Sequence, residues 1–169
     1  DTTEPDIGQP DGNLREMTDG EILVIDLGTT IDVSGTPEPA PDFVYYEFAA
    51  VPGPAGYIEI DWLILQISTD GNTWYTIFYW GDGAAETHTN VGGYTENDNE
   101  PIPLSVLYGS FPNKTGITID VDAAPGVAVP GALTNTIPGP VPAGSYRYLR
   151  IYAPPGGSND GAHIDSVDV

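Results

Sequence analysis

The chain has 169 residues, of which 25 are Asp or Glu and only 4 are Lys or Arg, so its formal net charge at pH 7 is -21. This charge argues against nucleic acid and anionic membrane surfaces as partners, and the length favours one domain with a buried core. The chain contains no Cys, so it forms no disulfide bond and depends on packing and on any bound metal ion for its stability.

The 21 Gly and 17 Pro residues are scattered between β-branched and aromatic runs, which predicts many turns and no long helix. We find no apolar run of about 18 residues that could cross a bilayer. The sequence begins at Asp1 without a Met, as a processed or trimmed chain would. We therefore expect a tail over residues 1–5 and a single β-sandwich domain over residues 6–169.

Alternation of apolar and polar residues predicts most of the strands in chain order. These strands cover residues 21–27, ending at Gly28, and then residues 42–48, 116–122, 145–152 and 163–169. A single helical turn could form within residues 103–109. The long polar segment 81–103 is a candidate binding or packing surface, and residues 123–142 are expected to wrap across the surface.

The sequence predicts a β-hairpin over residues 57–80, because two apolar runs meet at the Asp-Gly turn of residues 70–71. A shift in the alternation at residues 61–62 predicts a bulge or bend. Both faces of the hairpin carry apolar residues, so we expect a central position, covered on both sides. The return strand is expected to place Trp74, Thr76 and Phe78 on one face and Tyr75, Ile77 and Tyr79 on the other.

Strands at this spacing without a helical period indicate an all-β fold, specifically a jelly-roll β-sandwich. The string LQISTDGNTW at 65–74 resembles the hairpin of discoidin-type and other galactose-binding-like domains. YRYLRIY at 146–152, with the closing IDSVDV, is similar to the last two strands of that fold. IGQPDGN, EILVIDLG and DFVYYE also resemble secreted bacterial surface modules of this superfamily.

The resemblance implies a galactose-binding-domain-like sandwich whose end loops bind glycans or protein partners, often beside a structural calcium, and it implies no catalysis. The chain lacks the Cys pair and the basic loops of true discoidin domains, so lipid binding is not expected. The residues themselves also indicate no catalysis. The chain has no Gly-x-Ser-x-Gly motif, and neither His88 nor His163 lies in a sequence context typical of a catalytic triad.

Calcium is the candidate cofactor, since carboxylates, Asn side chains and backbone carbonyls supply the hard oxygen ligands that it prefers. Two groups of residues are candidate sites, and neither has the spacing of an EF-hand. One is Asp6 and Asp11 with Asp160 or Asp165, because terminal strands often lie close together, and the other is Asn97, Asp98, Asn99 and Glu100.

Exposed aromatic rings near polar side chains are typical of carbohydrate sites. Trp80, Tyr94 and Tyr108 lie in or beside predicted loops, with Asp82 as a candidate partner for sugar hydroxyls. Trp80 fits a stacking role and a packing role equally well. Trp62 and Trp74 follow the strand pattern and are assigned to the core.

The sequence therefore predicts a secreted, non-catalytic β-sandwich at a microbial cell surface, which binds glycans or mediates adhesion with calcium stabilising its loops. The alternative is a structural subunit that assembles with copies of itself into an extracellular filament or layer. Assembly would use residues 1–9, the long polar segment and the aromatic edges, with divalent ions relieving carboxylate repulsion. An acidic hydrolase ranks third.

Overall fold

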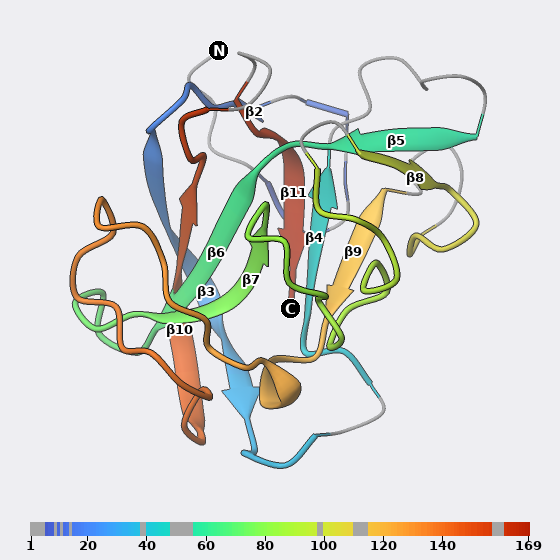
Figure 1. The fold of residues 1–169 in the computed structure, drawn as a ribbon. Helices are drawn as coiled ribbons and strands as arrows, with labels where there is room; N and C mark the ends of the chain where they lie inside the picture. The colour runs from blue at the N-terminus through green and yellow to red at the C-terminus, as the bar shows by residue number, and fades with distance from the viewer. Residues whose placement is uncertain are drawn as a thin grey trace.

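The computed structural model describes residues 6–8, 10, 12–13, 15–37, 40–47, 56–97, 100–109, 115–156 and 161–169. Strands dominate these residues, and they contain no α-helix, only the 3-10 turn η1 (Val121–Ala123) (Figure 1). No helix in the described ranges has the length and apolar character to span a bilayer. The predicted all-β class is confirmed.

Two main sheets face each other (Figure 1). The first sheet has the order β1 (Asp6–Ile7), β11 (His163–Asp168), β4 (Phe43–Glu47) and β9 (Gly116–Ile119), and β2 (Arg15–Glu16) also pairs with β11. The second sheet has the order β3 (Ile22–Val33), β10 (Gly144–Tyr152), β6 (Leu63–Ser68) and β7 (Tyr75–Trp80). A third pair joins β5 (Tyr57–Ile60) to β8 (Glu100–Pro103). The pairings are antiparallel except that of β1 with β11.

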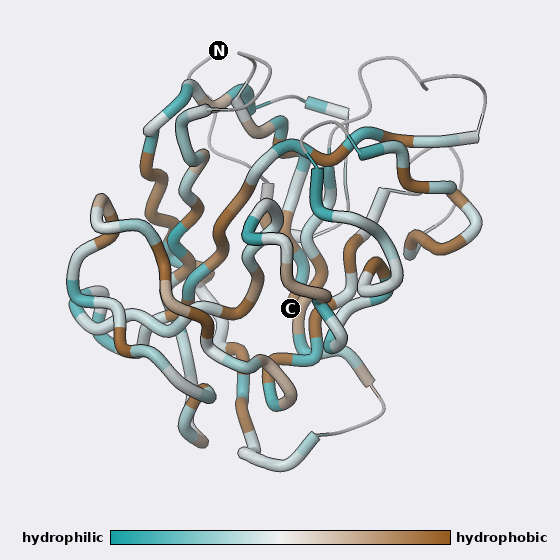
Figure 2. Tube along the Cα trace, in the orientation of Figure 1, coloured by the Kyte–Doolittle hydropathy of each residue, from teal (hydrophilic) through white to brown (hydrophobic). Residues whose placement is uncertain are grey.

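The core lies between the two main sheets, where apolar side chains at alternate strand positions meet. Figure 2 shows the apolar residues as brown stretches along the strands of both sheets. The second sheet contributes Leu23, Ile25, Leu27, Leu65, Ile67, Phe78, Trp80, Leu149 and Ile151, and the first contributes Phe43, Tyr45, Ile117, Ile119, Ile164 and Val167. One cluster thus draws on both sheets, as expected of a β-sandwich.

The hairpin forms at the predicted place. Asp70 Oδ1 accepts hydrogen bonds from the amides of Asn72 (2.8 Å) and Thr73 (2.9 Å), and Gly71 has a φ of 72°, which favours glycine. The predicted break at residues 61–62 is also present, because β5 pairs with β8 whereas β6 joins the second sheet. The chain changes sheets at the point where its apolar pattern changes phase.

The predicted faces of β7 are wrong from Phe78 onward. Leu65 lies opposite Phe78 and Gln66 lies opposite Thr76, so Ile77 is an extra residue in a β-bulge. The bulge turns Phe78 into the core and turns Tyr79 to the outer face. Strict alternation cannot anticipate this, because a bulge shifts every later side chain to the other face.

Residues 123–142, which we name the covering segment, lie over the outer face of the second sheet. Arg150 on β10 donates from Nη1 to the Thr134 carbonyl (3.2 Å), and the Trp74 amide donates to the Asn135 carbonyl (3.0 Å). Leu133 packs against Ile64 on β6. The predicted wrapping is confirmed, and β6 is buried on both faces. Of the two hairpin strands, however, only β6 has the predicted central position, because β7 is the last strand of its sheet.

Two smaller expectations are also corrected. β3 does not end at Gly28 but continues to Val33, because Gly28 adopts a φ of 67° where the pairing with β10 is irregular. Residues 104–106 form a hydrogen-bonded turn after β8, with the Val106 amide donating to Pro103, and no helix.

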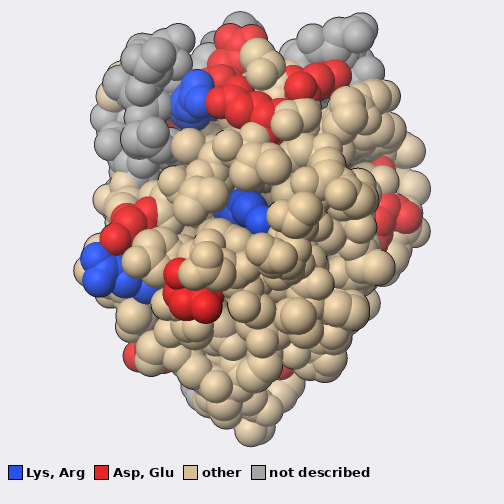
Figure 3. Space-filling view, turned by 90° about the vertical axis from the view of Figure 1, so that its left-hand side faces the viewer, with Lys and Arg blue, Asp and Glu red and all other residues tan. Residues whose placement is uncertain are grey.

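Charged side chains are unevenly distributed. On the side of the molecule at the left of Figure 1, where the covering segment lies, they gather in a few places and most of the visible surface carries none (Figure 3). This part of the surface is therefore less acidic than the composition alone suggests.

Candidate functional site

The outer face of the second sheet carries a row of large side chains beside the covering segment. The strand register places Tyr152 on β10 opposite Ile64 on β6, and Ile64 opposite Tyr79 on β7. Because directly opposed residues project to the same face, the two tyrosine rings flank Ile64. All three belong to one apolar cluster with Leu133 of the covering segment.

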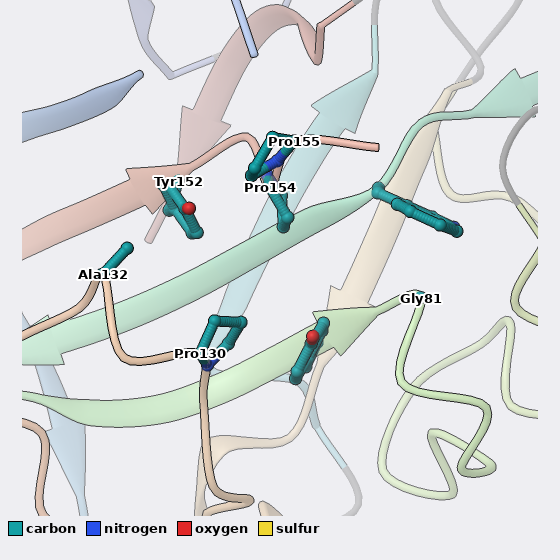
Figure 4. Close-up of a pocket in the computed structure, with 8 residues that line it drawn as sticks. Gly81, Pro130, Ala132, Tyr152, Pro154 and Pro155 are labelled. Atoms are coloured by element: carbon teal, nitrogen blue, oxygen red, sulfur yellow. The ribbon is translucent and has the colours of Figure 1, made fainter. Parts of the chain in front are cut away.

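A cleft of about 330 Å³ opens above this row (Figure 4). Figure 4 shows Pro130 and Ala132 of the covering segment on one side and Pro154 and Pro155, which follow β10, on the other. The lining residues are Trp62, Tyr79, Gly81, Pro130, Ala132, Tyr152, Pro154 and Pro155. Three aromatic rings and three prolines make the cleft mainly apolar, with two tyrosine hydroxyls as its polar side-chain groups.

Trp62 is held against glycine backbone at the edge of the cleft. A Cβ atom at Gly81 would lie 2.6 Å from Trp62 Cδ1, and one at Gly156 would lie 3.3 Å from Cζ3 of the same ring. Gly81 also has a φ of 115°, which few other residues adopt. Both observations explain why glycine follows β7. The buried Nε1 of Trp62 has no hydrogen-bond partner.

The loop after β7 folds back along the open edge of that strand. Glu86 Oε1 accepts a hydrogen bond from the Tyr79 amide (3.0 Å), and Nε2 of His88 lies 2.7 Å from the Ile77 carbonyl. Burial lowers the pKa of His88, so the imidazole is neutral and Nε2 is the donor. These side chains satisfy backbone groups that an edge strand otherwise leaves unpaired.

Three carboxylates gather beside the cleft. One oxygen from each of Asp82, Glu86 and Glu96 lies within 4.8 Å of the others. Glu96 Oε2 accepts from the amides of Gly81 (3.3 Å) and Gly83 (3.2 Å), and Asp82 Oδ1 accepts from the amide two residues later (2.7 Å). Gly81 thus belongs to both features, since it lines the cleft and binds Glu96.

The electrostatics reflect this crowding of like charges. Burial raises the pKa of Glu86 to about 8, with a further contribution from Glu96 and Asp82. Burial and then the adjoining Asp82 carboxyl raise the pKa of Glu96 to about 7. Burial, followed by Asp82, Tyr152 and Glu96, raises the pKa of the Tyr79 phenol. The charges of Asp82 and Glu96 thus act on the Tyr79 phenol, which lines the cleft.

The structure separates the predicted glycan-binding residues. Trp80 is fully buried and stacks on Phe78, so of its two alternative roles the structure shows packing. Tyr94 packs partly buried against the core, whereas Tyr108 is 51% exposed and bridges to Gly116, away from the cleft. Asp82 lies in the carboxylate group beside the cleft. The strand pattern assigns Trp62 to the core alone, but this residue is only partly buried: its ring packs against the core and also lines the cleft.

The two predicted calcium groups lie partly outside the described residues. The parts that lie outside the described residues are Asp11, Asp98, Asn99 and Asp160, together with the side chain of Asp6. Both oxygens of Asp165 accept from the Gly12 amide (3.2 and 3.1 Å), so the terminal segments lie together as expected. Glu100 accepts from Asn97 Nδ2 (3.2 Å).

Two further groups of acidic residues are bound up with the fold. Asp42 and Asp120 accept from backbone amides around η1, at Val121 (2.9 Å) and Ala123 (3.1 Å). Asp61 lies 2.9 Å from Nδ1 of His163, next to Glu47. We therefore assign structural roles to both groups.

Comparison of the chain with protein-family models, with curated proteins and with solved structures finds no match. The fold and the cleft define an all-β, sandwich-like protein with an aromatic cleft on the outer face of one sheet.

Proposed function

We propose that this protein is a secreted, non-catalytic, calcium-stabilised module of the galactose-binding-like jelly-roll type, which binds a glycan at a microbial surface. The observation that carries this proposal is the cleft, in which Trp62, Tyr79 and Tyr152 lie beside the carboxylates of the loop after β7. The resemblance of residues 65–74 to galactose-binding-like hairpins supports the fold type.

The chemistry of the cleft suits a sugar. A pyranose ring presents C–H groups on its faces and hydroxyls on its edges. The apolar rings and prolines can pack against the faces, whereas the tyrosine hydroxyls and the Asp82 carboxylate can bind the edges. A purely apolar ligand would leave these polar groups without partners. The volume of about 330 Å³ suits one or two sugar rings.

Retention on insoluble polysaccharides such as cellulose, chitin and xylan tests the proposal. We expect Trp62→Ala to abolish retention on the polysaccharide that retains the wild-type protein, with the sandwich still folded by circular dichroism. Tyr57→Ala is the matched control, because Tyr57 is an exposed aromatic residue on β5, outside the cleft. Unchanged retention of Trp62→Ala, or loss in Tyr108→Ala alone, would rule out the cleft as the glycan site.

A second candidate is a structural subunit that assembles with its own copies, and one observation favours it. In the described part of the chain no strand pairs with the outer edge of β3, which is 12 residues long and carries the exposed side chains Ile22 (44%) and Val24 (50%). Long apolar edges invite pairing with another chain. Light scattering should then show species larger than a monomer, whose size Val24→Lys reduces, and a strictly monomeric native sample would exclude assembly.

A further inference from the structure

We propose that Asp82, Glu86 and Glu96 form a binding site for one divalent cation, Ca²⁺, at the edge of the aromatic cleft. Neither group of calcium ligands suggested by the sequence contains these three residues. The site gives a location to the calcium of the proposed function. Cation binding can be measured without any glycan, so the two proposals can fail separately.

The spacing of the oxygens fits a single ion. Ca²⁺ binds oxygen at about 2.3–2.6 Å, so two ligands on opposite sides of one ion are about 5 Å apart and adjacent ligands are closer. One oxygen of each of the three carboxylates lies within 4.8 Å of the other two. An ion placed among them could therefore contact all three without a change in the backbone.

The carboxylates are already oriented. Each has one oxygen that accepts a backbone hydrogen bond, in the case of Glu86 from β7 and in the cases of Asp82 and Glu96 from the loop itself. These bonds hold the side chains in place before an ion arrives, so binding costs little ordering. Asp82 and Glu96 each have a second oxygen that these bonds leave available, and the second oxygen of Glu86 lies 3.3 Å from His88 Nε2.

One of these second oxygens points independently to a ligand. Glu96 is only 8% exposed, and its buried Oε1 has no hydrogen-bond partner. Burial and then the adjoining Asp82 carboxyl raise the pKa of Glu96, so the site disfavours the charged form of Glu96 while no cation is bound. Buried acceptors are almost always satisfied in native proteins. A cation among the three carboxylates would supply the missing partner.

No described basic side chain neutralises the group. Of the described ion pairs, none includes Asp82 or Glu96, and Glu86 pairs only with His88 (3.3 Å), which burial keeps neutral. The described arginines bind elsewhere: Arg15 to Glu21, Arg147 to Asp26 and Arg150 to Gln66. Glu86 and Glu96 are buried and lie close to the exposed Asp82, so negative charge on the group is disfavoured while no cation is present.

The donor set selects the metal. All three ligands are oxygens, which Ca²⁺ prefers, whereas Zn²⁺ prefers nitrogen and sulfur. Mg²⁺ demands shorter bonds in a regular octahedron and keeps most of its water. Asp82 is exposed, so water molecules can complete a larger and less regular Ca²⁺ shell.

Calcium titration of chelator-treated protein tests the site. Isothermal titration calorimetry should show Ca²⁺ binding, which Glu96→Gln and Asp82→Asn each weaken at least about tenfold. The matched control is Glu59→Gln, an exposed carboxylate on β5 that belongs to none of the carboxylate groups, and it should bind as the wild type does. Tb³⁺ offers a second readout, since Trp80 directly precedes Gly81 and should sensitise its luminescence.

Two results would overturn the proposal. One is wild-type protein that binds no Ca²⁺ at millimolar concentration and gives no sensitised Tb³⁺ emission. The other is undiminished affinity in Asp82→Asn, which would place any bound ion elsewhere. Asp82 is exposed, so this variant should fold and gives a decision even if Glu96→Gln does not fold.

Discussion

Arg150→Met should detach the covering segment from the second sheet. The guanidinium of Arg150 is buried beneath this segment, where Nε donates to Gln66 Oε1 (2.8 Å) and Nη1 and Nη2 reach the Thr134 carbonyl (3.2 and 3.3 Å). The charge also lies 4.5 Å from the centre of the Trp74 ring. Arg150 is thus the main polar connection between the sheet and the segment that forms one wall of the cleft.

The magnitude follows from the acceptors that the substitution leaves behind. Gln66 Oε1 and the Thr134 carbonyl would lose their charged donor, and each unsatisfied buried acceptor costs about 1–3 kcal/mol. Loss of the contact with Trp74 adds about 0.5–1 kcal/mol. Relief of the burial that lowers the pKa of Arg150 to about 10 offsets part of this. We expect a net loss of about 2–3 kcal/mol in the free energy of unfolding, a fall of roughly 5–10 °C in melting temperature.

Calorimetry and hydrogen exchange would measure the effect, the latter by following the amides of residues 133–137. Arg147→Met is the matched control, because its ion pair with Asp26 lies exposed on the same strand and should contribute little. A melting temperature of Arg150→Met equal to that of Arg147→Met, with full amide protection retained in the covering segment, would refute this role of Arg150.

Three further predictions concern the cleft and the carboxylates. Gly81→Ala should destabilise the fold by about 1–3 kcal/mol, seen in urea unfolding, and reduce glycan retention, because a Cβ displaces Trp62 and the φ of 115° becomes strained; unchanged stability and retention would contradict this. Trp80→Ala should cost about 3–5 kcal/mol, because it empties the core, and would be contradicted by a wild-type melting curve. In EDTA, the raised pKa values of Glu86 and Glu96 keep protons on both side chains in the folded protein. The unfolded chain releases these protons once the pH exceeds 4.5, the ordinary pKa of a glutamate. Stability should therefore fall as the pH rises, from about 4.5 to 7 through Glu96 and from about 4.5 to 8 through Glu86, by up to about 1.4 kcal/mol per pH unit for each group; Glu86→Gln should flatten the slope, and an equal slope in that variant would contradict this prediction.

The sequence predicts the strands well because their signals are local. The Asp-Gly turn and the phase shift at residues 61–62 each report on a few neighbouring residues, and both predictions are confirmed. The end of β3 is missed because Gly28 reads as a terminator, whereas pairing with β10 carries the strand through it. The tendency of Gly28 to end a strand is outweighed by the antiparallel pairing of β3 with β10 on both sides of it.

The cleft depends on information that local patterns lack. Tyr79 and Tyr152 are far apart in the chain and become neighbours only because β6 lies between β7 and β10. The bulge at Ile77 decides that Tyr79 faces outward at all. Strand order and bulges are set by the whole sheet. The alternation alone therefore could not show that Trp80 is buried in the core whereas the ring of Trp62 lines the cleft.

The sealing of β7 by Glu86 and His88 has a consequence for association. With that edge blocked, β3 is the remaining open edge of the second sheet in the described part of the chain. Two copies that joined there would use the same edge on both sides, an arrangement with two-fold symmetry that leaves no free strand for a third copy. The second sheet by itself therefore favours closed pairs, and an open fibre would need contacts from the other sheet.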